Sequence, residues 1–315
     1  MKSVILKKLL SSVIVIFLLT ILVFLIVHLL PGDPITVMLG ENAGDPEMVA
    51  IVMAKYNLDK PLPFQYFAWL KNVLKGDFGT SLASKSEIMP ELMERLPRTL
   101  VLCLIPMLFS LAIAIVLGIV SASHHNSNLD LGISVGSLAF LSVPEFWTGI
   151  LLMLLFAVEL KILPAGGYKK PSAGFAKYLK YMVLPFVTMI LHSMPSTIRM
   201  VRSSMLEVIS EDYMMLARTK GCSNARCNYV HGLRNSLVPI ATNLSLTITS
   251  QMAGVIVIEK VFQYPGTGLM LLTGITNRDY PVVQACILVF SIIVVVINLL
   301  TDLAYVLIDP RIRYK

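Results

Sequence analysis

Six long apolar stretches alternate with polar segments along the chain. They lie at about residues 9–30, 100–121, 133–160, 181–198, 237–258 and 282–306. A helix of about 20 mostly apolar residues crosses a hydrocarbon core roughly 30 Å thick, and five stretches meet this length. The remaining stretch, 181–198, is shorter and is interrupted by Pro185, His192 and Pro195, but membrane helices tolerate proline. The pattern predicts an all-α membrane protein with six transmembrane helices.

The first apolar stretch is expected to be a retained membrane helix rather than a cleaved leader. Its run from Leu9 to Leu30 exceeds the apolar core of about 7–15 residues that a secretory leader has. The run ends at Pro31-Gly32, and no cleavage site of small residues follows it.

The basic residues predict that both ends of the chain lie in the cytoplasm. They are Lys2, Lys7 and Lys8 before the first stretch and Arg311, Arg313 and Lys315 after the last. An odd number of spans would place the charged segment at about 205–236 and the C-terminus on opposite sides of the membrane. The loop at 161–180 opposes this orientation, because it carries five lysines and would face outward. Six spans, an even number, place the basic residues of both termini on the cytoplasmic side.

The pattern also divides the chain into parts. They are an N-terminal tail with the first transmembrane helix (1–30), an external region (31–99), a core transmembrane domain (100–306) that includes a cytoplasmic loop at about 205–236, and a cytoplasmic C-terminal tail (307–315). We call residues 205–236 the charged loop.

Composition agrees with a protein embedded in a lipid bilayer. Hydrophobic residues make up 56% of the chain and charged residues 14%, whereas soluble domains have about 25% charged residues. The net charge of +7 is the excess expected at a cytoplasmic lipid surface, so it does not indicate nucleic-acid binding.

The charged loop is predicted to form two short helices around a turn. Ser210 suits the N-cap of a helix over Glu211–Lys220, and Gly221 suits a left-handed residue after its end. Ser223 is then expected to cap a second helix that runs through about His231.

An apolar stripe along the loop leaves two interpretations open. Leu206, Ile209, Tyr213 and Leu216 follow helical spacing, which suits either a helix lying on lipid or a helix that docks on a partner protein. The acidic start of the segment and the sharp turn at Gly221 favour docking, because anionic lipid repels acids and a helix on lipid needs no turn.

The fifth apolar stretch carries one polar helical face. Asn243, Thr247, Ser250 and Gln251 recur at positions i, i+4, i+7 and i+8. Such residues either line a pathway for substrate or form hydrogen bonds between helices, and spacing alone leaves both open. Gly254 on the same stretch permits close approach of a neighbouring helix.

Metal binding is not expected. Cys222, Cys227 and His231 form a C-x4-C-x3-H pattern, but zinc sites have tighter cysteine pairs and four ligands. His124 and His125 are adjacent, so their side chains are expected to diverge.

Other functional classes find little support in the sequence. An ion-coupled transporter needs ionisable groups deep in several spans, whereas here only Glu145 and Asp302 occur, near span ends. The chain has no H-E-x-x-H or G-x-S-x-G motif, so no catalytic residue is predicted. It also has no G-x-x-x-x-G-K-[ST] motif with which to bind nucleotide phosphates.

The charged loop resembles that of ABC transporter permeases of the dipeptide/oligopeptide/nickel family, specifically the B-type subunit. The matching residues are Asp212, Tyr213, Ala217, Arg218, Lys220, Gly221, His231, Leu233, Arg234, Asn235, Leu237 and Pro239. Further matches follow the family's order along the chain: LPGDP (30–34), GDFGTS (76–81), SVPEFW (142–147), VIEKVFQYPGTG (257–268), NRDYPVVQ (277–284) and DPRIR (309–313). The general permease loop signature begins Glu-Ala-Ala, and only Ala217 and Gly221 keep its phase here.

The resemblance implies a type I ABC permease in the bacterial inner membrane. Its partners would be a second homologous permease subunit, one or two ABC ATPase subunits and an extracytoplasmic binding protein. ATP and Mg²⁺ would be bound by the ATPase subunits, and this chain would bind no cofactor. Residues implied to couple the chain to the ATPase are Asp212, Tyr213, Ala217, Arg218, Lys220, Gly221, His231 and Arg234. Di- or oligopeptides are the expected substrate, with nickel or a metal chelate as the alternative.

Overall fold

The computed structural model describes residues 2–29, 45–47, 49–50, 53 and 59–308. The described residues are helical, apart from loops and an isolated β-bridge between Thr80 and Glu87. The long helices are α1 (Lys2–Leu29), α5 (Ile88–Ser123), α8 (Phe175–Ile209), α11 (Leu233–Val261) and α13 (Tyr280–Ile308). The shorter helices are α4 (Leu62–Leu74), α6 (Asn128–Ser142), α7 (Glu145–Met153), α9 (Asp212–Thr219), α10 (Asn224–Arg226) and α12 (Thr267–Thr276).

Within the described residues, four helices are long and apolar enough to cross a membrane. They cover Leu6–Leu25, Ile88–Ser123, Phe175–Ile209 and Tyr280–Thr301. A bent pair, α6 with α7 and its π-helical extension to Glu159, raises the number to five if it counts as one span. The predicted span at 237–258 is helical as part of α11 but is not among these candidates. The all-α membrane class is therefore confirmed, and the count of six spans stays a prediction.

The apolar stretch predicted at 133–160 is broken rather than straight. Its two halves meet at 96° around Pro144. The ring of a proline disfavours helical geometry at the preceding residue, and Val143 is accordingly extended, with φ −99° and ψ 131°. As a result, Glu145 lies in the first turn of a new helix instead of inside a continuous one.

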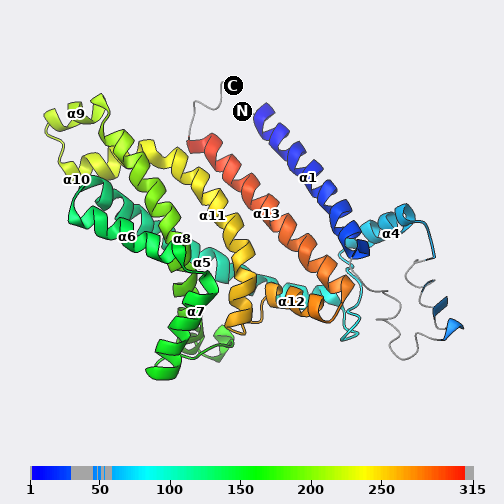
Figure 1. Ribbon diagram of the computed structural model, residues 1–315. Helices are drawn as coiled ribbons and strands as arrows, with labels where there is room; N and C mark the ends of the chain where they lie inside the picture. Colours follow the sequence, from blue (N-terminus) through cyan, green and yellow to red (C-terminus); the bar gives the residue numbers. More distant parts are fainter. Residues whose placement is uncertain (1, 30–44, 48, 51–52, 54–58, 309–315) are drawn as a thin grey trace. The chain divides into compact units, whose positions relative to one another are not determined.

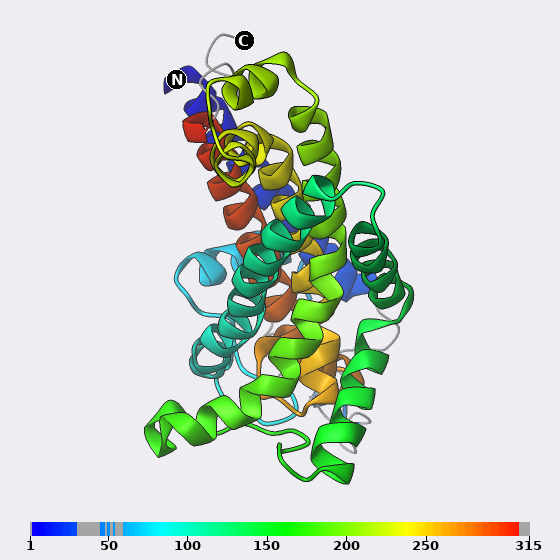
Figure 2. The same ribbon diagram turned by 90° about the vertical axis from the view of Figure 1, so that its left-hand side faces the viewer.

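The chain folds as two compact units, and the first contains residues 100–264. In this unit α8 packs against α6, α7 and α11. It runs the length of the unit, with α9 and α10 near one end and α7 at the other (Figure 1; Figure 2). α5 approaches α8 closely at Gly118, where a Cβ atom would lie 2.6 Å from the Cβ of Val201. Around that contact, Ile119, Val201 and Met205 form part of a buried core.

The second unit contains residues 7–99 and 265–296. Asp279 joins two distant segments within it, because its carboxylate accepts hydrogen bonds from the hydroxyl of Ser81 and from the amides of Leu82 at 3.1 Å and Ala83 at 3.2 Å. Ser81 ends the GDFGTS match and Asp279 lies within NRDYPVVQ, so these two motifs meet in space.

The predicted domain boundaries and the cytoplasmic location of both termini stay predictions. The C-terminal tail, 307–315, lies outside the described residues from position 309 onward, as does the DPRIR match. The external region, 31–99, is described only from residue 45 and with gaps up to residue 59.

Candidate functional site

The charged loop turns at Gly221 as its sequence predicts. α9 ends in a Schellman motif, in which the amide of Gly221 donates to the carbonyl of Arg218 at 3.0 Å and the amide of Cys222 donates to that of Ala217 at 3.1 Å. Gly221 has a φ of 85°, a conformation that side-chain-bearing residues rarely adopt. The expected left-handed turn is therefore confirmed.

The capping residues are only partly as predicted. Ser223 caps the second helix, since its hydroxyl accepts from the amide of Arg226 at 3.4 Å. Ser210 does not cap α9: it ends α8, and its hydroxyl donates to the carbonyl of Glu207 at 2.7 Å. Glu211, with extended backbone, is the N-cap of α9 and makes no side-chain capping bond. The prediction for Ser210 was wrong because α8 extends to residue 209 and Ser210 is its C-cap.

The second predicted helix is longer than expected. It does not stop near His231, because α10 continues through a π-helical turn, Cys227–Gly232, into α11. Tyr213 in α9 is fastened to the start of α11, where Nδ2 of Asn235 donates to its hydroxyl at 2.8 Å. The turn at Gly221 is thus joined directly to a long helix of the first unit.

The predicted apolar stripe is split between two helices. Leu206 and Ile209 lie in α8 and pack on the buried core, whereas Tyr213 and Leu216 lie in α9 and are exposed. Met214 is the side chain with which α9 packs on the protein, and it is fully buried. The break at residues 210–211 changes the helix axis, so the spacing does not continue as one face.

α9 instead presents exposed apolar residues. Tyr213, Met215 and Leu216 are 41%, 69% and 55% exposed. The π-helical turn that packs against α9 adds exposed Tyr229 and Val230. We call these five residues the apolar patch. Most of the predicted coupling residues are likewise exposed: Asp212, Arg218, Lys220, Gly221, His231 and Arg234, while Ala217 is half-buried.

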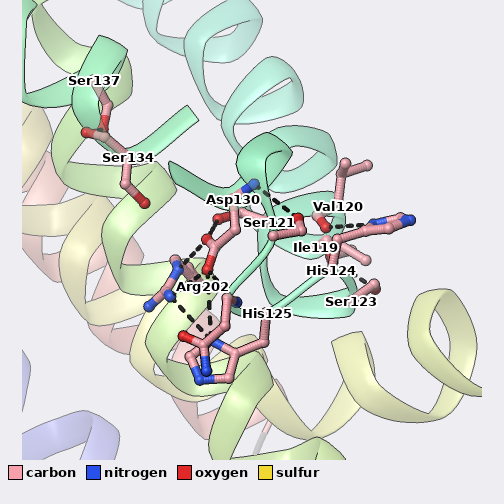
Figure 3. A network of polar contacts seen from close by, with 12 residues as sticks. Ile119, Val120, Ser121, Ser123, His124, His125, Asp130, Ser134, Ser137 and Arg202 are labelled. Atoms are coloured by element: carbon pink, nitrogen blue, oxygen red, sulfur yellow. Dashed lines mark hydrogen bonds and ion pairs between the residues drawn. The ribbon is translucent and has the colours of Figure 1, made fainter. Parts of the chain in front are cut away.

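A polar network that the sequence gave no reason to expect ties α6 to α8 (Figure 3). Asp130 is buried, and its two carboxylate oxygens accept from Nε and Nη2 of Arg202, both at 2.7 Å. The hydroxyl of Ser121 and the amide of Asn126 also donate to Asp130. A third guanidinium contact runs from Arg202 Nη2 to Nδ1 of His125 at 3.1 Å. A buried carboxylate with this many donors is fully satisfied, which makes the network a rigid joint.

The histidine and cysteine pairs have partners within the protein. Nδ1 of His124 lies 3.0 Å from the carbonyl of Val120, so the two adjacent imidazoles have different partners. Hydrogen bonding with Cys222 and burial raise the pKa of the Cys227 thiol, which disfavours the thiolate form that binds metals. No group of three or more ligating side chains occurs in the described part of the chain.

A cavity of about 250 Å³ lies between α6, α7, α8 and α11, entirely within the first unit. The whole predicted polar face of α11 lines it, namely Asn243, Thr247, Ser250 and Gln251. Further polar residues come from α7 and α8: Glu145, His192, Ser193 and Ser196. The structure thus brings the face together with ionisable groups from two other helices.

The four residues of the polar face differ in how their hydrogen bonds are satisfied. Asn243 Nδ2 donates to the Thr197 hydroxyl at 3.1 Å, and Thr247 donates to the carbonyl of Asn243 at 2.8 Å. These two residues therefore bond within and between helices as well as lining the cavity. Gln251 is only 5% exposed, and neither atom of its amide has a partner among the described residues.

Sequence reasoning noted Glu145 and His192 but did not place them in the site. Both interrupt apolar stretches, which was the available signal. Only the bend at Pro144 carries Glu145 toward α11, where a Cβ atom on Gly254 would lie 2.6 Å from its Oε2. Gly254 therefore allows a close approach as expected, but of a carboxylate rather than of a second helix backbone.

Two family models together match nearly the whole chain. Residues 114–314 match the family described as binding-protein-dependent transport system inner membrane component. Residues 1–103 match the N-terminal region of the same kind of membrane component.

Three relatives are similar over nearly their full lengths. The oligopeptide transport system permease protein AppB of Bacillus subtilis is 37% identical, covering 100% of both chains. The di/tripeptide transport system permease protein DppB of Pseudomonas aeruginosa is 37% identical, covering 94% of both. The glutathione transport system permease protein GsiC of Pectobacterium atrosepticum is 40% identical, covering 98% of both.

Proposed function

Because this chain belongs to the family of binding-protein-dependent transport system inner membrane components, we propose that it forms the pathway for peptides in an ABC importer. The chain is an inner-membrane permease subunit with no catalytic activity or bound cofactor of its own. It works in a complex with an ATPase and a binding protein. The observation that carries the peptide pathway is the cavity in which the polar face of α11 meets Glu145 and His192.

Peptides are the substrates that the site favours. The three relatives bear names for oligopeptides, di- and tripeptides, and glutathione, which is itself a tripeptide. Neutral hydrogen-bonding side chains dominate the cavity lining and suit backbone amides and carbonyls. Nickel import, the alternative, receives less support because the described residues hold no cluster of metal ligands.

The charged loop is proposed as the coupling element that seats on the ATPase. Its exposed apolar patch offers a docking surface, and Arg218 and Lys220 give that surface a basic rim. The Schellman turn and the bond between Tyr213 and Asn235 attach α9 firmly to α11, whose polar face lines the cavity. A push on α9 would therefore be transmitted to the cavity wall.

The proposal extends to topology and assembly. Counting α11 and the bent pair as spans gives six, with both termini in the cytoplasm. The complete importer would contain a second homologous permease subunit and one or two ATPase subunits.

Reconstitution tests the proposal. Proteoliposomes that contain the permease, its partner subunits and the loaded binding protein should accumulate radiolabelled dipeptide only when ATP is supplied. Uptake driven by an ion gradient without ATP would instead establish a secondary transporter. ATP-driven accumulation of Ni²⁺ but not dipeptide would establish the metal alternative.

A further inference from the structure

The amide of Gln251 and Nδ1 of His192 are buried polar groups of the cavity that lack hydrogen-bond partners among the described residues, and Gln251 lacks them at both of its polar atoms. Burying an amide without hydrogen bonds costs free energy, so buried polar side chains are normally paired. Gln251 is 95% removed from solvent, and both of its polar amide atoms lack a partner among the described residues. Since it lines the cavity, a molecule held there can supply the missing hydrogen-bond partners.

Glu145 supplies a carboxyl group to the same cavity. Its carboxylate lies against α11 at Gly254, where a side chain would leave it no room. Glu145 makes no ion pair with any residue that the structure describes. A carboxylate that lines a cavity and has no cation beside it can pair with a positively charged ligand.

The size of the cavity and its set of ligands decide which cation it suits. About 250 Å³ is below the roughly 300–1,000 Å³ of pockets that enclose drug-sized ligands, so it holds one end of a peptide. A divalent metal ion takes several ligating side chains, whereas the described residues contain no group of three. A primary ammonium needs one carboxylate and a few neutral acceptors for its three N–H donors. Glu145, the carbonyl of Gln251 and the hydroxyls of Ser193 and Ser196 provide them.

We infer that this cavity binds the amino-terminal end of the transported peptide, with Glu145 as the counter-ion of its α-ammonium and Gln251 hydrogen-bonded to its first peptide group. The inference rests on the proposed function and adds to it a recognition site in the permease. The permease would then bind peptides with a free amino terminus selectively after they leave the binding protein.

Charge removal at Glu145 tests the inference in the reconstituted complex. Glu145→Gln keeps the size of the side chain and removes its charge, so uptake of alanyl-alanine should fall roughly tenfold, the loss expected for one charged hydrogen bond. Stimulation of ATP hydrolysis by the loaded binding protein should stay within about twofold of wild type. The matched control is Glu159→Gln, because Glu159 is an exposed carboxylate at the far end of the same bent pair, and its uptake should be unchanged.

The outcomes separate this inference from the proposed function. Normal dipeptide uptake by Glu145→Gln overturns the recognition site and leaves the importer intact. Equal loss of uptake and of ATPase stimulation also overturns it, since Glu145 would then serve coupling. No ATP-driven dipeptide uptake by the wild type overturns the proposed function and the inference together.

A measurement on the unmodified protein covers the case in which the variant does not assemble. Two dipeptides that carry photoreactive leucine, one at the first residue and one at the second, are added to the wild-type complex and irradiated. The first-residue probe should label segments that contain Glu145 or Gln251, and the second-residue probe should label them much less. Equal labelling by both probes, or labelling only elsewhere, overturns the inference.

Discussion

At the scale of single residues, Gly221 shows a backbone requirement that can be separated from packing. An added Cβ there meets no heavy atom within 4 Å, yet the residue has a φ of 85°. Gly221→Val should therefore cost about 1–2 kcal/mol through left-handed strain alone and tilt α10 away from α9. We expect normal amounts in the membrane but loss of ATPase stimulation by the loaded binding protein. Gly132→Ala is the control, because Gly132 has open space and an ordinary φ.

A second residue-scale prediction concerns the joint between α6 and α8. Arg202→Met removes both guanidinium bonds to Asp130 and leaves this buried carboxylate without its cation, which should destabilise the protein by about 3 kcal/mol. Thermal unfolding of the purified permease measures the loss. Arg199→Met, at an exposed arginine on the same helix, should leave the unfolding temperature unchanged. An equal shift in both variants would show that the network is not a stabilising joint.

At the scale of helices, the polar face of α11 combines two functions that mutation can separate. Gln251→Leu removes a buried amide with no partner, so it should reduce uptake while leaving thermal stability equal or higher. Asn243→Leu removes the bond to Thr197 and should lower stability by about 1 kcal/mol as well as impair uptake. Uptake and unfolding measured on the same preparations test the contrast. Normal uptake by both variants would mean that the face serves packing only.

Helix-scale features also show what the sequence could and could not predict. Helical spacing correctly placed Asn243 and Gln251 on one face, and the preference of glycine for positive φ correctly placed the turn at 221. The stripe through Leu206 and Leu216 was misjudged, because spacing assumes one continuous axis and the chain changes axis at residue 210. The pairing of Asp130 with Arg202 spans 72 positions, and no local pattern carries such information.

At the scale of the whole molecule, the number of spans decides which side of the membrane each loop faces. Six spans place residue 169 outside and residue 218 inside, whereas losing the bent pair as a span, with the N-terminus still inside, would exchange the sides of these two loops. Cysteine labelling in intact cells distinguishes the two arrangements. The native thiol at Cys222 is half-exposed beside the turn, so it is first replaced by serine to remove background labelling.

In that background, Lys169→Cys should react with a membrane-impermeant maleimide in intact cells, since residue 169 is exposed. Arg218→Cys, also exposed, should react only after the inner face is opened.

Labelling of both positions from outside would place the charged loop on the side of the membrane opposite to ATP hydrolysis. That result would contradict the coupling role of α9. Labelling of residue 218 alone from outside would invert the topology and assign the five lysines of loop 161–180 to the cytoplasm, as the positive-inside tendency of that one loop favours. The expected pattern instead requires that the basic termini outweigh those lysines. Gly166 and Gly167 lie against Phe262 at the end of α11, so the loop between the bent pair and α8 is on the same side of the membrane as that end of α11. We therefore expect the loop to be carried across the membrane together with its helices, despite its lysines.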